Sequence, residues 1–525
     1  MKSWLLHSVI ISLVLQSILC YVPNAISQTR GKVWPQPNNM QQTSEVLEVS
    51  GKVAWKIAQI GYWAWQDRCD IIEKSITRHR RWIEAEAVGQ YHTPAYKSVV
   101  ERISVKVAQG CTDAYPDENM DESYSITVSA PEVVISSAQV WGALRAIETM
   151  SQLIYPDPQH VRLLVNRGSV VDKPKYSYRG FMIDTSRHYI PMQIIMKQLD
   201  AMEAVKLNVL HWHLTDDHSF PYVSEVYPEL SRKGAYNQHT HVYTAKDINE
   251  VIQEARLRGI RVIPELDIPA HTRSWSKGHP EMFNQCSRKK FNEGKGPLLD
   301  IENSQTFKVL EKLIGEISNV FRDKNFHLGG DEFYHDCIPG STPSIVNFFQ
   351  ELRSIIGRVS GSTTIRAMFW QDLLKMGATV PQNSIVNVWK HWVNDEHYLK
   401  QAISTSNISI IVSHPWYLDN MSRGEKWRLN YDVEMFKQLG DSKVRSRVIG
   451  GQACLWAEFV DATNFLQWAW PDAGGTAENL WSDKVPSSKS GDVQERMNEL
   501  RCRLIVRGIP ARPIQAGFCD TEWAY

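Results

Sequence analysis

The sequence predicts an α/β protein whose main part is a (β/α)8 TIM barrel, preceded by a small α+β domain. The chain has 525 residues, which is enough for one large domain and a smaller one. After Tyr178, short apolar runs alternate with amphipathic helical patterns, and we count eight such runs. A strand followed by a helix, repeated eight times, is typical of a closed parallel barrel. We expect a signal peptide at 1–27, an N-terminal α+β domain at 28–174 and the barrel at 175–525.

The first residues have the pattern of a secretory signal. Lys2 precedes an apolar stretch from Trp4 to Leu19, and small residues follow at Ala25 and Ser27. The stretch is short and contains polar residues, so an uncleaved membrane anchor is the less favoured interpretation. We expect a protein of the secretory pathway, either secreted or in a lysosome or vacuole, with no integral membrane span after cleavage.

From about residue 32 to 171, strand and helix patterns are mixed. The stretches "ERISVKVAQG" and "ESYSITVSA" read as strands, and "SSAQVWGALRAIETMSQLIY" spaces its apolar residues as a helix does. These patterns predict the small α+β unit.

The eight apolar runs give the expected barrel strands in order. They are "RGFMID", "LNVLHWHL", "IRVIPELD", "NFHLGGDE", "AMFWQD", "SIVNVWK", "ISIIVSHPWYLD" and "VIGGQACLWAE". Between the second and third runs, the stretch "TAKDINEVIQEARLRG" predicts a helix. Thr244 and Asp247 have the spacing of a helix N-cap and the third residue after it, and the helix is expected to stop at Gly259.

Polar and aromatic side chains follow these strands at their carboxyl ends, where the loops of a barrel converge on one mouth. An isolated Asp–Glu pair is usually a solvated turn or a helix cap. In "HLGGDEF", however, Asp331 and Glu332 end a barrel strand, so we expect both in the mouth. The other expected mouth residues are Asp184, Arg187, His213, Asp216, Asp217, Glu265, Asp267, His271, Trp370, Asp372, Trp389, Tyr417, Asp419, Trp456 and Glu458.

A mouth of carboxylates, one arginine and tryptophans suits a neutral polyol. Tryptophan faces pack on the C–H face of a sugar while carboxylates and arginine bind hydroxyls, so glycoside hydrolysis is the reaction indicated. A phosphate site would need a glycine-rich loop and concentrated positive charge. Lys+Arg and Asp+Glu are both 58 and no basic block occurs, so we expect no nucleic-acid partner and no attraction to anionic membranes.

His211 and His213 lie on one side of the second strand, with Asp216 and Asp217 after them, which invites a metal interpretation. Buried strand histidines are more often satisfied by hydrogen bonds. We therefore expect no metal and no cofactor.

Seven cysteines follow the signal, and an odd number in an oxidising compartment leaves one unpaired. We expect the pairs Cys69–Cys111, Cys286–Cys337 and Cys502–Cys519, with Cys454 as a buried free thiol. The sequons at Asn407 and Asn420 predict glycosylation.

From "KVWPQP" at Lys32 to the last cysteines, the chain resembles the β-N-acetylhexosaminidases of glycoside hydrolase family 20, of the lysosomal hexosaminidase type. The motifs that carry the resemblance are "RGFMIDTSRHYIP", "KLNVLHWHLTDDHSFP", "ARLRGIRVIPELDIPAH", "HLGGDE", "HPWYLD" and "GGQACLWAEFVD". The resemblance implies an exo-acting hydrolase that removes terminal β-linked N-acetylglucosamine or N-acetylgalactosamine from glycoconjugates or chitooligosaccharides. It also implies a retaining, substrate-assisted mechanism through an oxazolinium intermediate, fits the expected cysteine pairs, and suggests a homodimer.

The resemblance assigns a role to each motif residue. The catalytic set would be Glu332 as general acid and then base, Asp331 on the acetamido N–H, Tyr417 on the acetamido oxygen, and Asp217 with His271 as a relay that orients Glu332. The substrate-binding set would be Trp370, Trp389 and Trp456 as aromatic walls, with Arg187, Asp419 and Glu458 on ring hydroxyls.

Two other functions compete with this one. A secreted carbohydrate-binding or recognition protein with little turnover would not need Asp331, Glu332 and Tyr417 together. An endo-acting chitinase should show a D-x-x-D-x-D-x-E run, which the sequence lacks. The chain also departs from the family at Ala270, where glycine is usual, and at "FYHDCI" after Glu332, while Asn420 argues against acidic sugar substrates.

Overall fold

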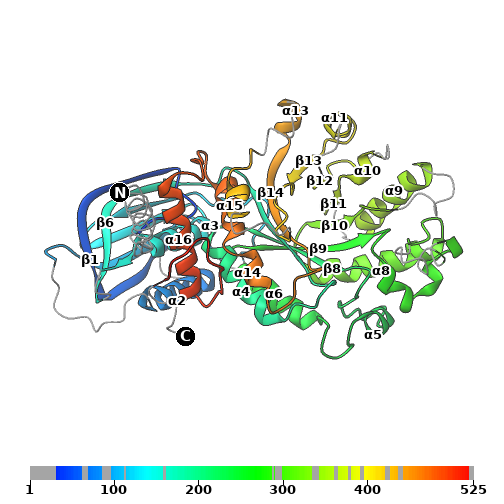
Figure 1. Ribbon diagram of the computed structural model, residues 1–525, viewed down its shortest axis with the longest axis horizontal. Helices are drawn as coiled ribbons and strands as arrows, with labels where there is room; N and C mark the ends of the chain where they lie inside the picture. The colour runs from blue at the N-terminus through cyan, green and yellow to red at the C-terminus, as the bar shows by residue number, and fades with distance from the viewer. Residues whose placement is uncertain are drawn as a thin grey trace, which may run out of the picture.

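The computed structural model describes the chain in segments and shows two domains side by side (Figure 1). The described residues are 31–61, 69–85, 96–111, 114–157, 161–286, 289, 298–333, 342–359, 365–375, 380–390, 395–419, 426–434 and 442–519. The predicted signal peptide at 1–27 lies outside them. Among the described residues, none of the helices combines the length and the apolar character that a membrane span requires.

The larger domain is a closed barrel of eight parallel strands, as predicted. Neighbouring strands follow one another in chain order, and the last strand, β14, pairs with the first, β7. The strands are β7 (Tyr178–Asp184), β8 (Val209–Thr215), β9 (Arg261–Ile268), β10 (Asn325–Gly329), β11 (Arg366–Trp370), β12 (Ile385–Val388), β13 (Ser409–Val412) and β14 (Val448–Leu455). Each extends at most one residue beyond the apolar run that predicted it, so the (β/α)8 fold is confirmed.

Helices connect the strands and surround them. They are α4 (Met192–Ala204), α5 (Glu229–Gly234), α6 (Ala245–Arg256), α8 (Ser304–Val320), α9 (Thr342–Val359), α10 (Asp372–Lys375), α11 (Asp395–Ser406), α12 (Lys426–Tyr431), α13 (Ser442–Arg445), α14 (Phe465–Ala469), α15 (Asp472–Trp481) and α16 (Gly491–Val506), with short 3-10 turns η1 (Arg273–Lys277) and η2 (Pro280–Met282).

Helix α6 begins with the capping box that the sequence predicted. The Thr244 hydroxyl accepts a hydrogen bond from the Asp247 amide at 3.3 Å, and the Asp247 carboxylate accepts one from the Thr244 amide at 2.8 Å. These bonds satisfy two backbone donors that a helix start leaves unpaired. The helix ends at Arg256, and Gly259 then adopts a φ of +64°, which glycine reaches without strain.

The smaller domain is an α+β unit built on a six-stranded sheet in the order β1-β2-β4-β3-β6-β5. Its elements are β1 (Asn39–Ile60), α2 (Asp70–Ala85), β2 (Val99–Val107), β3 (Tyr124–Val128), β4 (Glu132–Ser137), α3 (Val140–Leu153), β5 (Tyr155–Pro156) and β6 (Leu163–Asp172). The two predicted strands correspond to β2 and β3, and the predicted helix to α3. The boundary expected at residues 174–175 stays a prediction.

A buried carboxylate joins the two domains. Glu122 accepts hydrogen bonds from Arg145 of α3 at 2.7 Å, from Arg179 of β7 at 2.6 Å and from Asn208 at 3.1 Å. Burial alone would raise the pKa of Glu122, but the two guanidinium groups outweigh it and hold the pKa below its usual value. Removing one partner of such a buried ion pair typically costs about 3–5 kcal/mol, so this cluster fixes the sheet domain against the foot of the barrel.

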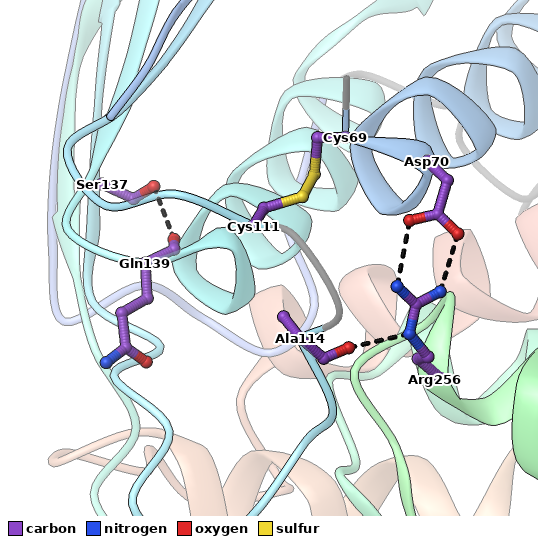
Figure 2. Close-up of a disulfide and its surroundings, with 7 residues drawn as sticks. All are labelled: Cys69, Asp70, Cys111, Ala114, Ser137, Gln139 and Arg256. Atoms are coloured by element: carbon purple, nitrogen blue, oxygen red, sulfur yellow. Dashed lines mark hydrogen bonds and ion pairs between the residues drawn. A yellow bond between two sulfur atoms is a disulfide. The ribbon is translucent and has the colours of Figure 1, made fainter. Parts of the chain in front are cut away.

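A second junction lies beside a disulfide, which Figure 2 shows. The Cys69–Cys111 bond fastens the start of α2 to the segment after β2. Next to it, Asp70 accepts two hydrogen bonds from Arg256 at the end of α6, and the Arg256 Nε donates to the Ala114 carbonyl oxygen at 2.7 Å. One barrel arginine thus contacts both segments that the disulfide holds together.

The cysteine predictions are confirmed where the structure describes the residues. Cys69 pairs with Cys111 and Cys502 pairs with Cys519, and Cys454 is buried and free. Cys286 is disulfide-bonded, but its expected partner, Cys337, lies outside the described residues.

The two ends of the described chain meet. The Trp34 indole N–H donates to the Gly474 carbonyl oxygen of α15 at 2.9 Å, and Arg503 of α16 donates to the Lys32 carbonyl oxygen at 2.7 Å. Helices α15 and α16, coloured orange and red in Figure 1, therefore lie against the smaller domain, which is coloured blue to cyan.

Candidate active site

Four aromatic rings form a continuous wall at the carboxyl ends of β11 to β14. The Trp389 ring stacks on Tyr417 at 6.1 Å between centroids, and Tyr417 lies 6.4 Å from Trp456. Trp370 lies 6.3 Å from Trp389 and 6.0 Å from Trp456. The side chains of Trp389, Tyr417 and Trp456 are half-buried. Trp370 is fully buried and its Nε1 donates to Glu265, so it supports the wall from behind instead of offering an open face.

Arg187 and its carboxylates continue the mouth next to Trp456, after the first strand, β7. The guanidinium donates to Asp184 at 3.1 Å, and a second nitrogen lies 2.8 Å from an oxygen of Asp216 and 3.9 Å from one of Glu458. It also lies over the Trp456 ring, 4.8 Å from the centroid. Asp184 was not given a role from the sequence, although it ends β7 and accepts the backbone N–H groups of residues 186, 187 and 457.

Asp216, and not Asp217, is the carboxylate that contacts His271. An Asp216 oxygen lies 3.3 Å from Nδ1 of His271, and the other lies 2.9 Å from Nε2 of His213. Asp217 instead accepts a hydrogen bond from the Arg273 amide at 2.9 Å. The contact expected between Asp217 and His271 is made by Asp216, while the relay role itself stays a prediction. The chain turns directly after β8 ends at Thr215, so the alternation of side chains along the strand no longer decides which carboxylate faces inward.

Charge in this cluster favours the protonated imidazole of His271. Burial by itself disfavours the imidazolium, but the carboxylates of Asp216 and Asp331 outweigh it and raise the pKa of His271 to about 9. Burial of Asp216 is likewise outweighed by Arg187 and His271, which hold its pKa well below the usual range. Arg187, His271 and Asp216 thus form a fixed ionic group in the mouth.

Beneath the mouth, Glu265 of β9 anchors a buried polar cluster that sequence reasoning did not assign. Its oxygens lie 2.8 Å from His213, 3.0 Å from His211 and 2.9 Å from His327. Although burial disfavours a charged imidazole, Glu265 and Asp216 raise the pKa of His213 to about 10. Period-two alternation places His211 and His213 on the barrel's inner side, which was the only sequence signal for this cluster.

The strand β10 ends in a sharp turn that separates the two adjacent carboxylates. Gly329, Gly330 and Glu332 have φ values of +62°, +88° and +52°. The Asp331 residue is 5 % exposed, whereas the Glu332 side chain is 50 % exposed. A left-handed conformation is unfavourable for a residue with a Cβ atom, and here it accompanies the separation of the exposed Glu332 carboxylate from the buried one of Asp331.

His271 and Lys390 lie on either side of the Glu332 carboxylate. The His271 Nε2 is 3.8 Å from an oxygen of Asp331 and 3.9 Å from one of Glu332. The Lys390 ammonium is 3.2 Å from the other Glu332 oxygen and lies over the Trp389 ring at 3.6 Å. Sequence reasoning missed Lys390, although its place directly after a strand-end tryptophan was a usable signal.

Two predicted site residues have polar atoms that find no partner among the described residues. They are the buried hydroxyl oxygen of Tyr417 and Oδ1 of Asp419. Burial raises the pKa of both groups. Asp372 accepts from Trp389 Nε1 at 2.6 Å, and burial together with Asp331 raises the pKa of Asp372 to about 6.

Several groups could reach a cation by distance alone. In the described part of the chain, His211, Glu265 and His327 have potential ligand atoms within 4.8 Å of one another, as do Asp216, Asp217 and His271. Glu265 already accepts a hydrogen bond from Trp370 and shares one with His213, and ring nitrogens of His211 and His327 lie 3.0 and 2.9 Å from its oxygens. The expectation that the site works without a metal or cofactor stays a prediction.

Comparisons with known proteins identify the fold and its family. The family model for the catalytic domain of glycosyl hydrolase family 20 matches residues 176–484, and one described as beta-acetyl hexosaminidase like matches residues 33–153. The human protein named beta-hexosaminidase subunit beta is 38% identical over 521 residues, covering 95% of this chain and 92% of the relative. The cattle protein named beta-hexosaminidase subunit alpha is 35% identical over 511 residues, covering 94% and 95%.

Solved structures share the architecture. A Flavobacterium johnsoniae chitobiase superposes with a TM-score of 0.76 at 23% identity, covering 92% of this chain and 74% of that one. A Streptomyces plicatus N-acetyl-beta-hexosaminidase in complex with Thio-NAglucal gives 0.73 at 21% identity, covering 94% and 99%. At these identities the likeness is one of fold.

The barrel, the aromatic and carboxylate-lined mouth and the matched catalytic domain together define a glycoside hydrolase. The chain belongs to glycosyl hydrolase family 20.

Proposed function

We propose that this chain is an exo-β-N-acetylhexosaminidase that removes terminal β-linked N-acetylglucosamine or N-acetylgalactosamine from the non-reducing ends of glycans. One observation carries the proposal: adjacent carboxylates diverge beside the aromatic wall, with Asp331 buried and Glu332 half exposed. Two neighbouring carboxylates cannot flank a glycosidic bond from opposite faces, as two-carboxylate catalysis needs. The substrate's own 2-acetamido oxygen is then the nucleophile.

Each carboxylate takes one part of that reaction. The acetamido oxygen attacks the anomeric carbon while Glu332 protonates the departing glycosidic oxygen, and the sugar closes to an oxazolinium ion. Asp331 accepts the acetamido N–H, so its negative charge lies where positive charge develops. Water, deprotonated by Glu332, then opens the ring with overall retention. An internal nucleophile can supply up to about 7–11 kcal/mol through effective molarity, and a general acid about 10²–10⁴ in rate.

The rest of the mouth positions the sugar. Trp389 and Trp456, with Trp370 behind them, would wall the acetamido pocket, and the unpartnered hydroxyl of Tyr417 would donate to the acetamido oxygen. The remaining polar groups, Arg187, Asp419 and Glu458, would bind ring hydroxyls. The relay that orients Glu332 would run from Asp216 through His271, in place of the one expected from Asp217.

The first test is hydrolysis of p-nitrophenyl β-glycosides of N-acetylglucosamine, N-acetylgalactosamine and glucose, with and without a thiazoline analogue of the cyclised intermediate. We expect release from both acetamido sugars only, blocked by the thiazoline, and the ratio of the two rates gives the epimer preference. No release from pH 4 to 8 by the folded protein would refute the proposal in favour of a carbohydrate-binding protein.

The Glu332→Gln variant separates acid catalysis from binding. It should keep thiazoline binding and lose about 10²–10⁴ of turnover on glycosides with poor leaving groups, with a smaller loss on p-nitrophenyl substrates. The matched variant Asp331→Asn should slow the first step with both kinds of leaving group. Equal losses for Glu332→Gln on both substrates would contradict its role as the acid.

The setting of the enzyme is also proposed. The relatives are named as subunits alpha and beta, which supports assembly with a second subunit, and the assembly we propose is a homodimer. Two disulfides support passage through the secretory pathway to the exterior, a lysosome or a vacuole. Asn407 is exposed, and its Nδ2, to which a glycan would be attached, donates to Asn383 at 2.9 Å, while Asn420 lies outside the described residues. Light scattering of the purified protein would test the dimer, and deglycosylation followed by mass measurement would test the sequons.

A further inference from the structure

A second buried carboxyl group lies beneath the Asp331 carboxylate. Asp267 is the penultimate residue of β9 and is 1 % exposed. Neither of its carboxyl oxygens has a hydrogen-bond donor among the described residues, and the same holds for Oδ1 of Asp331. Asp267, His271 and Asp331 each place a polar atom within 4.8 Å of the others. Three buried acceptor atoms without a donor are costly unless a proton lies among them.

The close approach of these carboxyl groups is built into the backbone. Gly329 of β10 pairs with Ile268 of β9, and a Cβ atom on Gly329 would lie 1.7 Å from Oδ1 of Asp267. The first glycine of "HLGGDE" therefore makes room for the Asp267 carboxyl group. Any side chain at this position would push β9 and β10 apart or displace Asp267.

We propose that Asp267 is a positioning residue that holds one proton and donates it in a hydrogen bond to Asp331, which stays ionised. The proton satisfies the buried Oδ1 of Asp331 and leaves its Oδ2, which lies 3.8 Å from His271, free to accept the acetamido N–H. This inference rests on the proposed function, in which Asp331 binds that group.

The surrounding charges place the proton on Asp267. The pKa of Asp267 is raised well above its ordinary value, mainly by burial. The negative charges of Asp331, Glu265 and Asp216 raise it further. The nearest cation, His271, is 3.9 Å from Asp267. Burial also raises the pKa of Asp331 above its ordinary value, but His271 and the hydrogen bond from Asp267 oppose this rise, and among the described residues no such cation or donor opposes the rise at Asp267.

A donor fixed in this way does two things for the reaction. It orients the plane of the Asp331 carboxylate before the substrate binds. It also avoids the repulsion that two ionised carboxylates would have in a buried site. A hydrogen bond from a neutral acid to a carboxylate is also stronger than one between neutral groups.

Two variants with the same branched side-chain shape as aspartate test the proposal. Asp267→Asn keeps a donor towards Asp331 and should retain kcat/KM on the acetamido p-nitrophenyl glycosides within about fivefold, whereas Asp267→Leu removes the donor and should lose about 10- to 150-fold. Equal losses in the two variants would overturn the proposal, because rescue by a donor would then be absent.

Infrared spectroscopy reads the proton directly and does not depend on turnover. At pH 8, where Asp372 is ionised because its pKa is about 6, the wild-type protein should show the C=O band of a protonated carboxyl group. The intensity of the band should fall in Asp267→Asn and also in Asp331→Asn, whose amide would donate to an ionised Asp267. An intensity unchanged by both substitutions would overturn the inference. Absence of wild-type turnover would refute the proposed function, while the band would still report the proton on Asp267.

Discussion

Replacing Asp216 with asparagine should remove the negative charge that three cations share. The Asp216 carboxylate lies 2.8 Å from Arg187, 2.9 Å from His213 and 3.3 Å from His271. Burial opposes the imidazolium of His271, yet Asp216 and Asp331 raise the pKa from 6.5 to about 9, which corresponds to about 3 kcal/mol in favour of the protonated form. Breaking a buried ion pair costs about 3–5 kcal/mol. We expect Asp216→Asn to lower the free energy of unfolding by about that amount.

The loss should depend on pH in a defined way. The pKa of His271 is higher in the folded protein, so its contribution is fully present below pH 6.5 and disappears as the pH rises through about 9. The pKa of Asp216 is lower in the folded protein than its ordinary 3.8, so its contribution is present above pH 3.8 and disappears as the pH falls through the lowered value. The difference between the wild-type protein and Asp216→Asn should therefore be greatest between these limits and shrink towards pH 9.

Asp217→Asn is the matched control, since it makes the same change one residue away. Asp217 accepts one backbone hydrogen bond, and burial and the charge of Asp216 raise its pKa. Neutralising it should cost no more than about 1 kcal/mol. Urea unfolding followed by tryptophan fluorescence at pH 5 and pH 9 would compare the variants. Equal losses for both variants, or a larger loss for Asp217→Asn, would refute the arrangement described for this cluster.

Three further substitutions follow from the structure. Gly329→Ala places a Cβ atom 1.7 Å from a buried carboxyl oxygen, at a φ of +62°. Thermal unfolding should show that this variant is less stable than the wild-type protein by at least about 2 kcal/mol. The control Gly357→Ala adds a Cβ atom in an open stretch of α9 and should not lower the stability. Tyr417→Phe removes a hydroxyl without a partner among the described residues, so folding should be kept while kcat on acetamido substrates falls by about 10²–10³. The double variant Cys69→Ser and Cys111→Ser opens a link between residues 42 apart, and denaturant titration should show a loss of about 4 kcal/mol.

The sequence predicted the framework because its signals are local. Each barrel strand is a continuous apolar run, and the box at Thr244 lies within four residues. The sequence could not distinguish Asp216 from Asp217, because the direction of a side chain in a tight turn depends on the loops packed against it. The contact between Gly329 and Asp267 was equally hidden, since it joins two strands whose register is fixed only when the barrel closes.

The meeting of the chain's two ends has a consequence for its synthesis. Trp34 donates to a carbonyl group 440 residues later in the sequence, and at about 5–20 residues per second the ribosome needs roughly 20–90 s to produce that partner. Throughout this interval the nascent smaller domain lacks the surface of α15 and α16 against which it finally packs. The smaller domain therefore reaches its final packing only after these two helices have been synthesised, and until then its Trp34 side chain lacks the partner that buries it in the folded protein.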